Sequence, residues 1–223
     1  MFPTYLRLGY EHLLDLQGAD HILFIVVLCA GYALARWREL LVLITAFTVG
    51  HSLSLALATV GAVRADSSWV EFLIPVTVAA TALLNFWEPG GEERRVAQGT
   101  AAPGAAPPAG LEEGASPGGS VPGETPRATR VKYVLAVVFG LIHGLGFSGF
   151  LRLLLGDEGS LLVPLLAFNI GLELAQIVVA LATLAAAALL VRGSRIPHTW
   201  WTRGVSAAVG VAAVVMAAGR WPL

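Results

Sequence analysis

Long apolar runs alternate with short polar interruptions along the chain, and this pattern predicts membrane-spanning helices. A helix needs roughly 20 apolar residues to cross the hydrocarbon core of a bilayer. Six runs approach or exceed that length, at residues 20–35, 40–63, 69–87, 131–155, 161–191 and 204–219. We therefore expect an all-α, polytopic membrane bundle of about six transmembrane helices.

Two segments depart from this pattern. Residues 5–17 mix leucines with charged side chains and are too short to span, so they predict a short amphipathic helix lying at the membrane surface. Residues 89–129 are rich in Pro, Gly and Ala and cannot build a core, which predicts a disordered linker. That linker would join two halves, 1–88 and 130–223, of one membrane domain.

The composition narrows the class of function. Of the 223 residues, 56% are hydrophobic and 13% are charged, which excludes an ordinary soluble domain. A net charge of −1 offers no basic surface for nucleic acid. The single cysteine, Cys29, lies in an apolar run and cannot form an internal disulfide.

Basic residues are divided unevenly between the two sides of the predicted bundle. Ten of the 14 Lys and Arg residues fall on the side that carries the linker. Cytoplasmic loops of membrane proteins collect Lys and Arg. We therefore expect the linker in the cytoplasm and both termini outside.

Two histidines and a glutamate lie deep in the predicted spans. His51 and His143 are each about 12 residues, or roughly 18 Å, into their helices, and Glu173 is similarly deep. A charged carboxylate at the bilayer centre costs about 2.5–3.5 kcal/mol unless it is paired or hydrated. Imidazole nitrogen and carboxylate oxygen together suit borderline divalent metals. These three residues predict a shared polar site near the middle of the membrane.

A second group of polar residues is expected near the outer face. Asp20, His21 and Glu71 stand at the starts of two spans, and His12 could join them. The two acids could instead be helix-start residues that favour the positive end of the helix dipole. As metal ligands, they would form an entrance to the deeper site.

Helical spacing supplies further candidates, because residues three or four positions apart share one face of a helix. Polar stripes occur at Thr48, His51 and Ser52 and at Asn169, Glu173 and Gln176, and small residues recur at Gly140, Gly144 and Ser148. The small residues predict close approach of a neighbouring helix. Asn169, Gln176 or Asn85 would line an exit toward the cytoplasm.

Several polar motifs occur in a defined order along the spans: Gly9-Tyr-Glu-His12, Gly18-Ala-Asp20-His21, Phe47-Thr-Val-Gly-His51-Ser, His143-Gly-Leu-Gly-Phe147 and Phe168-Asn169-Ile-Gly-Leu-Glu173-Leu-Ala-Gln176. Together they resemble the HupE/UreJ family of hydrogenase and urease accessory permeases. The likeness covers nearly every span except the last. Ser148 and Ala175 depart from it, since they stand where the family pattern has alanine and glycine.

The resemblance implies a bacterial inner-membrane protein that takes up nickel, with cobalt, zinc and copper as alternatives. It would make His21, His51, His143 and Glu173 metal ligands or gates, with Asp20 at the entrance. The bilayer and the metal ion would be its partners, and a second copy of the chain or metal-handling proteins could be others. No enzymatic activity is expected.

Other classes of function remain open. Gly146-Phe-Ser148-Gly149 matches the Gly-x-Ser-Gly nucleophile motif of rhomboid proteases, but such a serine needs a positioned base and the last span holds no histidine. The histidines could instead hold a zinc ion with an open position for water, as in a metal-dependent intramembrane hydrolase. A metal-binding accessory protein that transports nothing is the remaining alternative.

Overall fold

The structure is a computed structural model that describes residues 1–15, 18–32, 34–87, 126–155, 161–194 and 196–222. All regular structure in these ranges is helical. Five helices are long and apolar enough to cross a membrane: α3 (Trp37–Thr59), α4 (Ser67–Trp87), α6 (Pro126–Leu155), α7 (Leu162–Ser194) and α8 (His198–Gly219). The expected polytopic helical membrane fold is confirmed. The expected linker at 89–129 lies outside the described residues, except that α6 already begins at Pro126.

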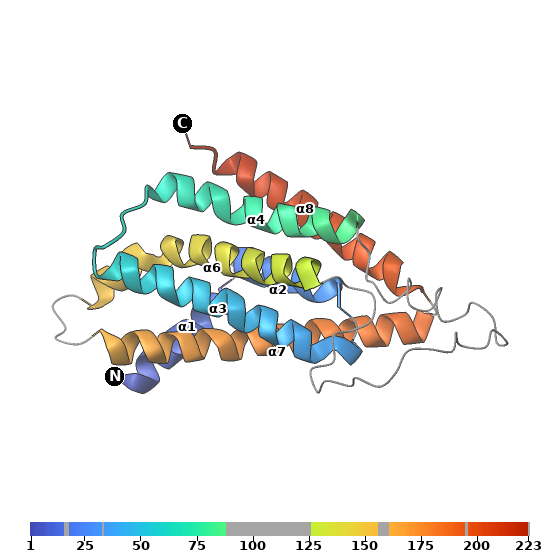
Figure 1. Ribbon diagram of the computed structural model, residues 1–223, viewed down its shortest axis with the longest axis horizontal. Helices are drawn as coiled ribbons and strands as arrows, with labels where there is room; N and C mark the ends of the chain where they lie inside the picture. Colours follow the sequence, from blue (N-terminus) through green and yellow to red (C-terminus); the bar gives the residue numbers. More distant parts are fainter. Residues whose placement is uncertain (16–17, 33, 88–125, 156–160, 195, 223) are drawn as a thin grey trace, which may run out of the picture.

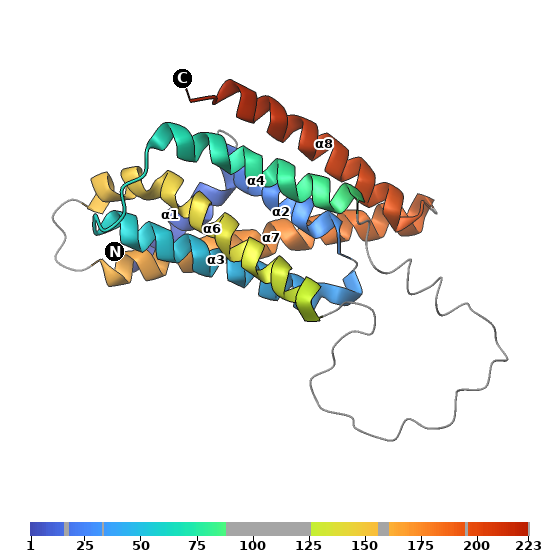
Figure 2. The same cartoon turned by 45° about the horizontal axis from the view of Figure 1, so that its top comes forward.

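The helices form a bundle whose long axes run in broadly the same direction. Figure 1 shows α4 and α8 along one side, α3 and α7 along the opposite side, and α6 between them. The turned view in Figure 2 keeps the same neighbours. Both chain termini lie toward one end of the bundle (Figure 1), which we call the terminal end.

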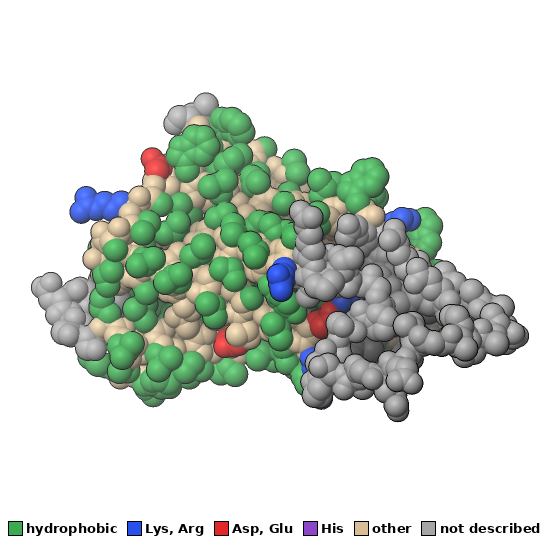
Figure 3. All heavy atoms as spheres, viewed as in Figure 1, with side chains coloured by type: hydrophobic (Ala, Val, Ile, Leu, Met, Phe, Trp, Pro, Cys, Tyr) green, Lys and Arg blue, Asp and Glu red, His purple; other side chains and the backbone are tan. Residues whose placement is uncertain are grey.

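The outer surface of the bundle is apolar in its middle. Figure 3 shows hydrophobic side chains over most of the described part of one face. Large side chains far from the helix ends remain exposed, such as Leu53 at 51%, Leu181 at 59% and Val211 at 67%. An apolar surface of this extent is stable in lipid, where exposed hydrocarbon carries no hydration cost.

The first expected span is interrupted. Residues 20–35 were expected to cross the membrane, but the helix there, α2 (Asp20–Ala30), ends after 11 residues. Eleven residues rise about 16 Å, roughly half of a bilayer core. It is preceded by α1 (Phe2–Leu14), which has 13 residues. Each is a half-length helix, and the five residues between Leu14 and Asp20 separate them.

The N-terminal helix α1 exists as expected and is amphipathic: one face packs against the bundle, while Arg7 and Glu11 on the other stay exposed. Tyr5, Gly9 and Leu13 recur every four residues and form a buried stripe. The stripe faces α7 so closely that a Cβ at Gly9 would lie 2.0 Å from the carbonyl oxygen of Phe168. At Gly171, a Cβ would lie 1.9 Å from the Leu6 carbonyl oxygen. The two backbones therefore touch.

The two half-length helices follow one another along α7. Leu13 of α1 packs against Leu172 and Ala175. The cluster that contains α2 includes Ala180 and Leu184, which lie farther along α7. The pair α1 and α2 thus replaces one continuous span by two helices with a break between them.

Side chains from other helices secure the end of α2 that lies away from the terminal end. Asn85 donates a hydrogen bond of 2.5 Å to the carbonyl oxygen of Val27, and the Thr202 hydroxyl donates one of 2.7 Å to Ala30. The last carbonyls of a helix have no partner within it, so these bonds satisfy groups that lipid cannot. Cys29, in the same turn, is buried and has a free thiol.

Helices α3 and α6 also meet backbone to backbone. A Cβ at Gly50 would lie 2.2 Å from the Val137 carbonyl oxygen, and one at Gly140 would lie 2.1 Å from that of Phe47. At Gly144, the same atom would lie 2.2 Å from the His51 carbonyl oxygen. The close approach expected from the small residues of α6 is present at Gly140 and Gly144, and α3 is the helix that approaches.

Replacing Gly140 by alanine tests this contact. We expect Gly140→Ala to destabilise the bundle by at least about 1–3 kcal/mol, because the added Cβ must push α3 away from α6. Thermal unfolding of the purified protein in detergent would measure the loss. Gly149→Ala is the matched control in the same helix, since a Cβ there meets nothing within 4 Å. Equal unfolding temperatures for both variants would contradict the contact.

Candidate metal centre

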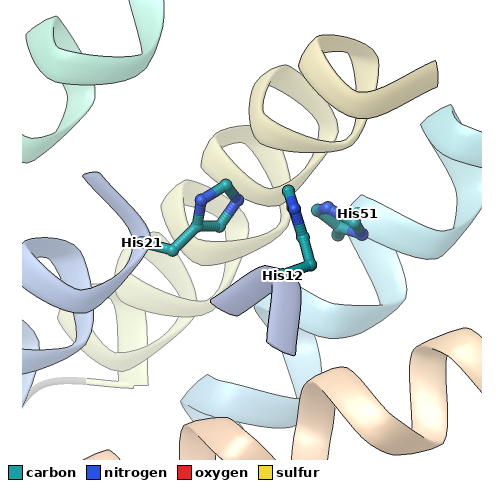
Figure 4. A group of neighbouring side chains, drawn as sticks. All are labelled: His12, His21 and His51. Carbon is teal, nitrogen blue, oxygen red and sulfur yellow. The ribbon is translucent and has the colours of Figure 1, made fainter. Parts of the chain in front are cut away.

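Three histidines meet at the break between α1 and α2. His12 lies in the last turn of α1, His21 in the first turn of α2, and His51 within α3. One ring nitrogen from each lies within 4.8 Å of the other two. Figure 4 shows the three rings turned toward the space between their helices. Three imidazoles converging at such distances could hold one metal ion.

His143 of α6 adds a fourth ring to this group. Its centroid lies 5.0 Å from that of His21, and its side chain is 0% exposed. The Nδ1 atom lies 2.8 Å from the carbonyl oxygen of Phe139. Because a carbonyl can only accept, Nδ1 carries the proton and Nε2 keeps its lone pair. A backbone carbonyl behind the ring is the usual way in which proteins orient a metal-binding histidine.

The Nε2 atoms of all four histidines are buried and have no hydrogen-bond partner among the described residues. For His51, Nδ1 is also without one. The ring of His21 is held by the backbone of Gly18, which leaves its Nε2 free. An unsatisfied buried polar atom costs about 1–3 kcal/mol. Four such atoms around one space are costly without a ligand and are well suited to a metal ion.

Phenylalanines surround the four rings. The Phe147 ring lies 3.9 Å from that of His12, and Phe168 stacks on His51 at 6.4 Å. On the other side, Phe47 lies 5.1 Å from His143. None of the histidines is visible among the described residues on the face in Figure 3. The apolar rings restrict water and raise the strength of any electrostatic interaction with a bound cation.

A pocket of about 720 Å³ connects His12, His21 and His143 with charged residues. Its lining includes the buried residues Asp20, His21 and His143 together with the exposed acids Glu11, Asp15 and Glu71 and with His12 and Arg220. An acidic mouth above a ring of imidazoles attracts cations and raises their local concentration. Asp20 is 5% exposed and pairs with Arg220, with Nη1 2.6 Å from Oδ2.

Glu173 lies in a different place from the four histidines. It lines a separate groove of about 440 Å³ between α3 and α7. Its Oε1 accepts a hydrogen bond of 2.9 Å from the Thr45 hydroxyl. Asn169 and Ser52 line the same groove. The structure therefore brings His12, and not Glu173, to the rings of His21, His51 and His143.

The remaining polar candidates have partners in the helices around them. Gln176 is buried and accepts a bond of 2.6 Å from Thr48, although its Nε2 has no partner among the described residues. The Ser52 hydroxyl donates to the Thr48 carbonyl oxygen at 2.7 Å. Asn85 secures the end of α2 and does not line either pocket.

Ser148 is held by its own helix. Its hydroxyl donates to the carbonyl oxygen of Leu145 at 2.7 Å, and within the described residues it has no hydrogen bond with a histidine. A nucleophilic serine requires a base within hydrogen-bond reach. The geometry thus offers no activated nucleophile at the Gly-x-Ser-Gly motif.

Two residues of the site were underrated or missed by the sequence analysis. His12 was only a supporting candidate, because its helix was expected on the membrane surface. The polar residues Asp15 and Gln17 and the helix breaker Gly18, between two apolar segments, were the available signal of a broken span. Arg220 was not selected at all, although a basic residue on the side poor in Lys and Arg is unusual.

Comparison with known proteins identifies one family. A family model described as HupE / UreJ protein matches residues 1–101 and 122–223. The two matched ranges include every helix of the bundle and all four histidines of the metal centre. No curated protein and no solved structure matches the chain.

The metal centre predicts binding by the purified protein. We expect it to bind Ni²⁺ or Co²⁺, and His51→Ala to weaken binding at least about tenfold, since even changes behind a ligand commonly cost 10–100-fold. Titration calorimetry measures the Ni²⁺ affinity. His198→Ala is the control. His198 is the first residue of α8, and its Nδ1 lies 3.3 Å from the Thr202 hydroxyl oxygen. Equal affinities for both variants would remove His51 from the site.

Proposed function

The chain belongs to the HupE / UreJ family, and we propose that it carries a divalent transition-metal ion across the bacterial inner membrane, with nickel or cobalt as the cargo. The family comprises accessory permease-like proteins that handle these metals and not enzymes. One observation carries the proposal for this chain: the imidazoles of His12, His21 and His51 converge between the ends of α1 and α2 with free Nε2 atoms, and the ring of His143 lies beside that of His21.

The lining of the larger pocket supports an order of events on the entry side. A hydrated cation is attracted by the acids Glu11, Asp15 and Glu71, which are exposed. It then exchanges water for imidazole nitrogen at the buried histidines. Neutral imidazole is a good ligand for nickel, cobalt, zinc and copper alike. The preference for nickel and cobalt therefore rests on the family and not on the donor atoms.

Asn169 connects the histidines with the second groove. It lies beside the His51 ring and also lines the groove that contains Glu173. The Asn169 amide nitrogen is already bonded to the Leu165 carbonyl oxygen at 2.8 Å, so its oxygen remains for other contacts. We propose that the metal leaves the histidines past Asn169 toward Glu173, whose oxygens hold a nickel ion less tightly than imidazole does.

The distribution of basic residues supports an orientation that suits uptake. The linker side carries ten of the 14 Lys and Arg residues, which supports a cytoplasmic linker and termini on the outer side. In that orientation the larger pocket, which is lined by Glu71 and Arg220 near the terminal end, faces outward. Uptake is then the direction of transport.

Metal accumulation by whole cells tests transport directly. We expect cells that express the wild type to accumulate Ni²⁺, and His143→Ala to abolish most of the gain, because Nε2 of that residue would be lost from the site. Ser148→Ala should accumulate Ni²⁺ like the wild type, since its hydroxyl serves only its own helix. Accumulation that no variant changes would contradict transport, whereas the serine-protease alternative requires Ser148→Ala to abolish cleavage of a membrane substrate.

Glu173→Gln separates the proposed exit from the entry site. The variant keeps the shape of the side chain and its acceptor for Thr45, but removes the negative charge. We expect Ni²⁺ affinity to stay within about threefold of the wild type. The uptake rate should fall at least about tenfold, because the exit step would lose the negative charge that receives the metal ion. A parallel loss of affinity would instead make Glu173 part of the histidine site.

A further inference from the structure

The ion pair between Asp20 and Arg220 lies directly on the entry route. Asp20 is the first residue of α2 and is followed by His21, one of the metal-centre histidines. Arg220 follows the end of α8 and reaches across to it, with 2.6 Å between Nη1 and Oδ2. Both side chains line the pocket that leads to the histidines.

The pair sets the charge next to the metal centre. In the lining of this pocket, Arg220 is the cationic side chain among four acids. Its guanidinium neutralises the acid that is nearest in sequence to a metal-centre histidine. The other oxygen of Asp20, Oδ1, is buried and has no hydrogen bond among the described residues. Asp20 thus keeps a free acceptor atom beside the site while its charge is balanced.

We infer that Arg220 is a tethered cation that competes with the incoming metal for Asp20. This inference rests on the proposed function and adds a device that limits affinity and promotes release. A dication at the histidines repels the guanidinium and attracts the carboxylate, so the ion pair opens when metal binds. When the metal leaves, Arg220 returns, because a buried carboxylate without a partner is strongly unfavourable.

The surroundings of Arg220 allow this exchange. Its side chain is 28% exposed, whereas that of Asp20 is 6% exposed. The next residue, Trp221, packs its ring edge-on against Phe72 at 5.0 Å between centroids. Glu71, the residue before Phe72, is exposed and lines the same pocket. A displaced guanidinium therefore has a second carboxylate within the pocket.

Ni²⁺ titration of the purified full-length protein tests the competition. We expect Arg220→Gln to lower the dissociation constant for Ni²⁺ at least about fivefold, because the Asp20 carboxylate is then no longer paired with a guanidinium and can attract the metal ion. Arg220→Lys keeps the charge and should remain closer to the wild type. Arg64→Gln is the matched control, since Arg64 is exposed between α3 and α4 and lines neither pocket.

Two further measurements separate competition from other effects of the substitution. In the Asp20→Asn background, adding Arg220→Gln should no longer tighten Ni²⁺ binding, because the arginine acts through that carboxylate. In uptake assays, Arg220→Gln should lower both KM and the maximal rate, since tighter binding slows release. An arginine that only stabilises the fold would not lower KM.

Chemical labelling of the wild type covers the case in which Arg220→Gln does not fold. Phenylglyoxal modifies accessible arginines, and we expect Ni²⁺ to increase its reaction with Arg220 at least about twofold while Arg64 stays constant. If the wild type binds Ni²⁺, two results overturn this inference and leave the proposed function standing. One is labelling of Arg220 that Ni²⁺ does not change, and the other is a folded Arg220→Gln protein whose Ni²⁺ affinity is unchanged or weaker. A wild type that does not bind Ni²⁺ overturns the proposed function and this inference together.

Discussion

Two pairs of helices touch backbone to backbone in this bundle, and the positions of the metal-centre histidines depend on these contacts. Helix α1 meets α7 through Gly9 and Gly171, and α3 meets α6 through Gly50, Gly140 and Gly144. Packed helices are normally held about 8–10 Å apart by a layer of side chains. Where glycine removes that layer, the rings from α1, α3 and α6 come close enough to share one space with the ring from α2.

The break in the first span supplies what a continuous helix could not. In one continuous helix, His12 and His21 would be separated along a single axis. The break lets them approach from two helix ends, with their ring centroids 4.9 Å apart. The carboxyl end of α1 carries partial negative charge, which favours a cation nearby. The amino end of α2 carries partial positive charge, and Asp20 in its first turn offsets it.

The predictable part of the site is the part that depends on one helix at a time. Depth along a span and the face of a helix follow from residue spacing, and these properties single out His51 and His143 together with the glycines beside them. Glu173 has a comparable depth, but the buried face of α7 carries Phe168 and Leu172, so Glu173 points into the groove toward Thr45. Depth does not specify the rotation of a helix about its axis, and packing against neighbours decides it.

Sequence alone indicated the class of protein, the family resemblance, the five long spans and three of the four histidines, His21, His51 and His143, because hydropathy, run length and motif order are properties of the chain itself. Only the tertiary structure decided that the first expected span is interrupted, that α1 packs against α7, and that His12 joins the other histidines. It also decided that Arg220 reaches Asp20, 200 positions away. These features arise from contacts between segments that are distant in sequence: glycines let the backbones of α1 and α7 meet, and side chains from α4 and α8 bind the end of α2.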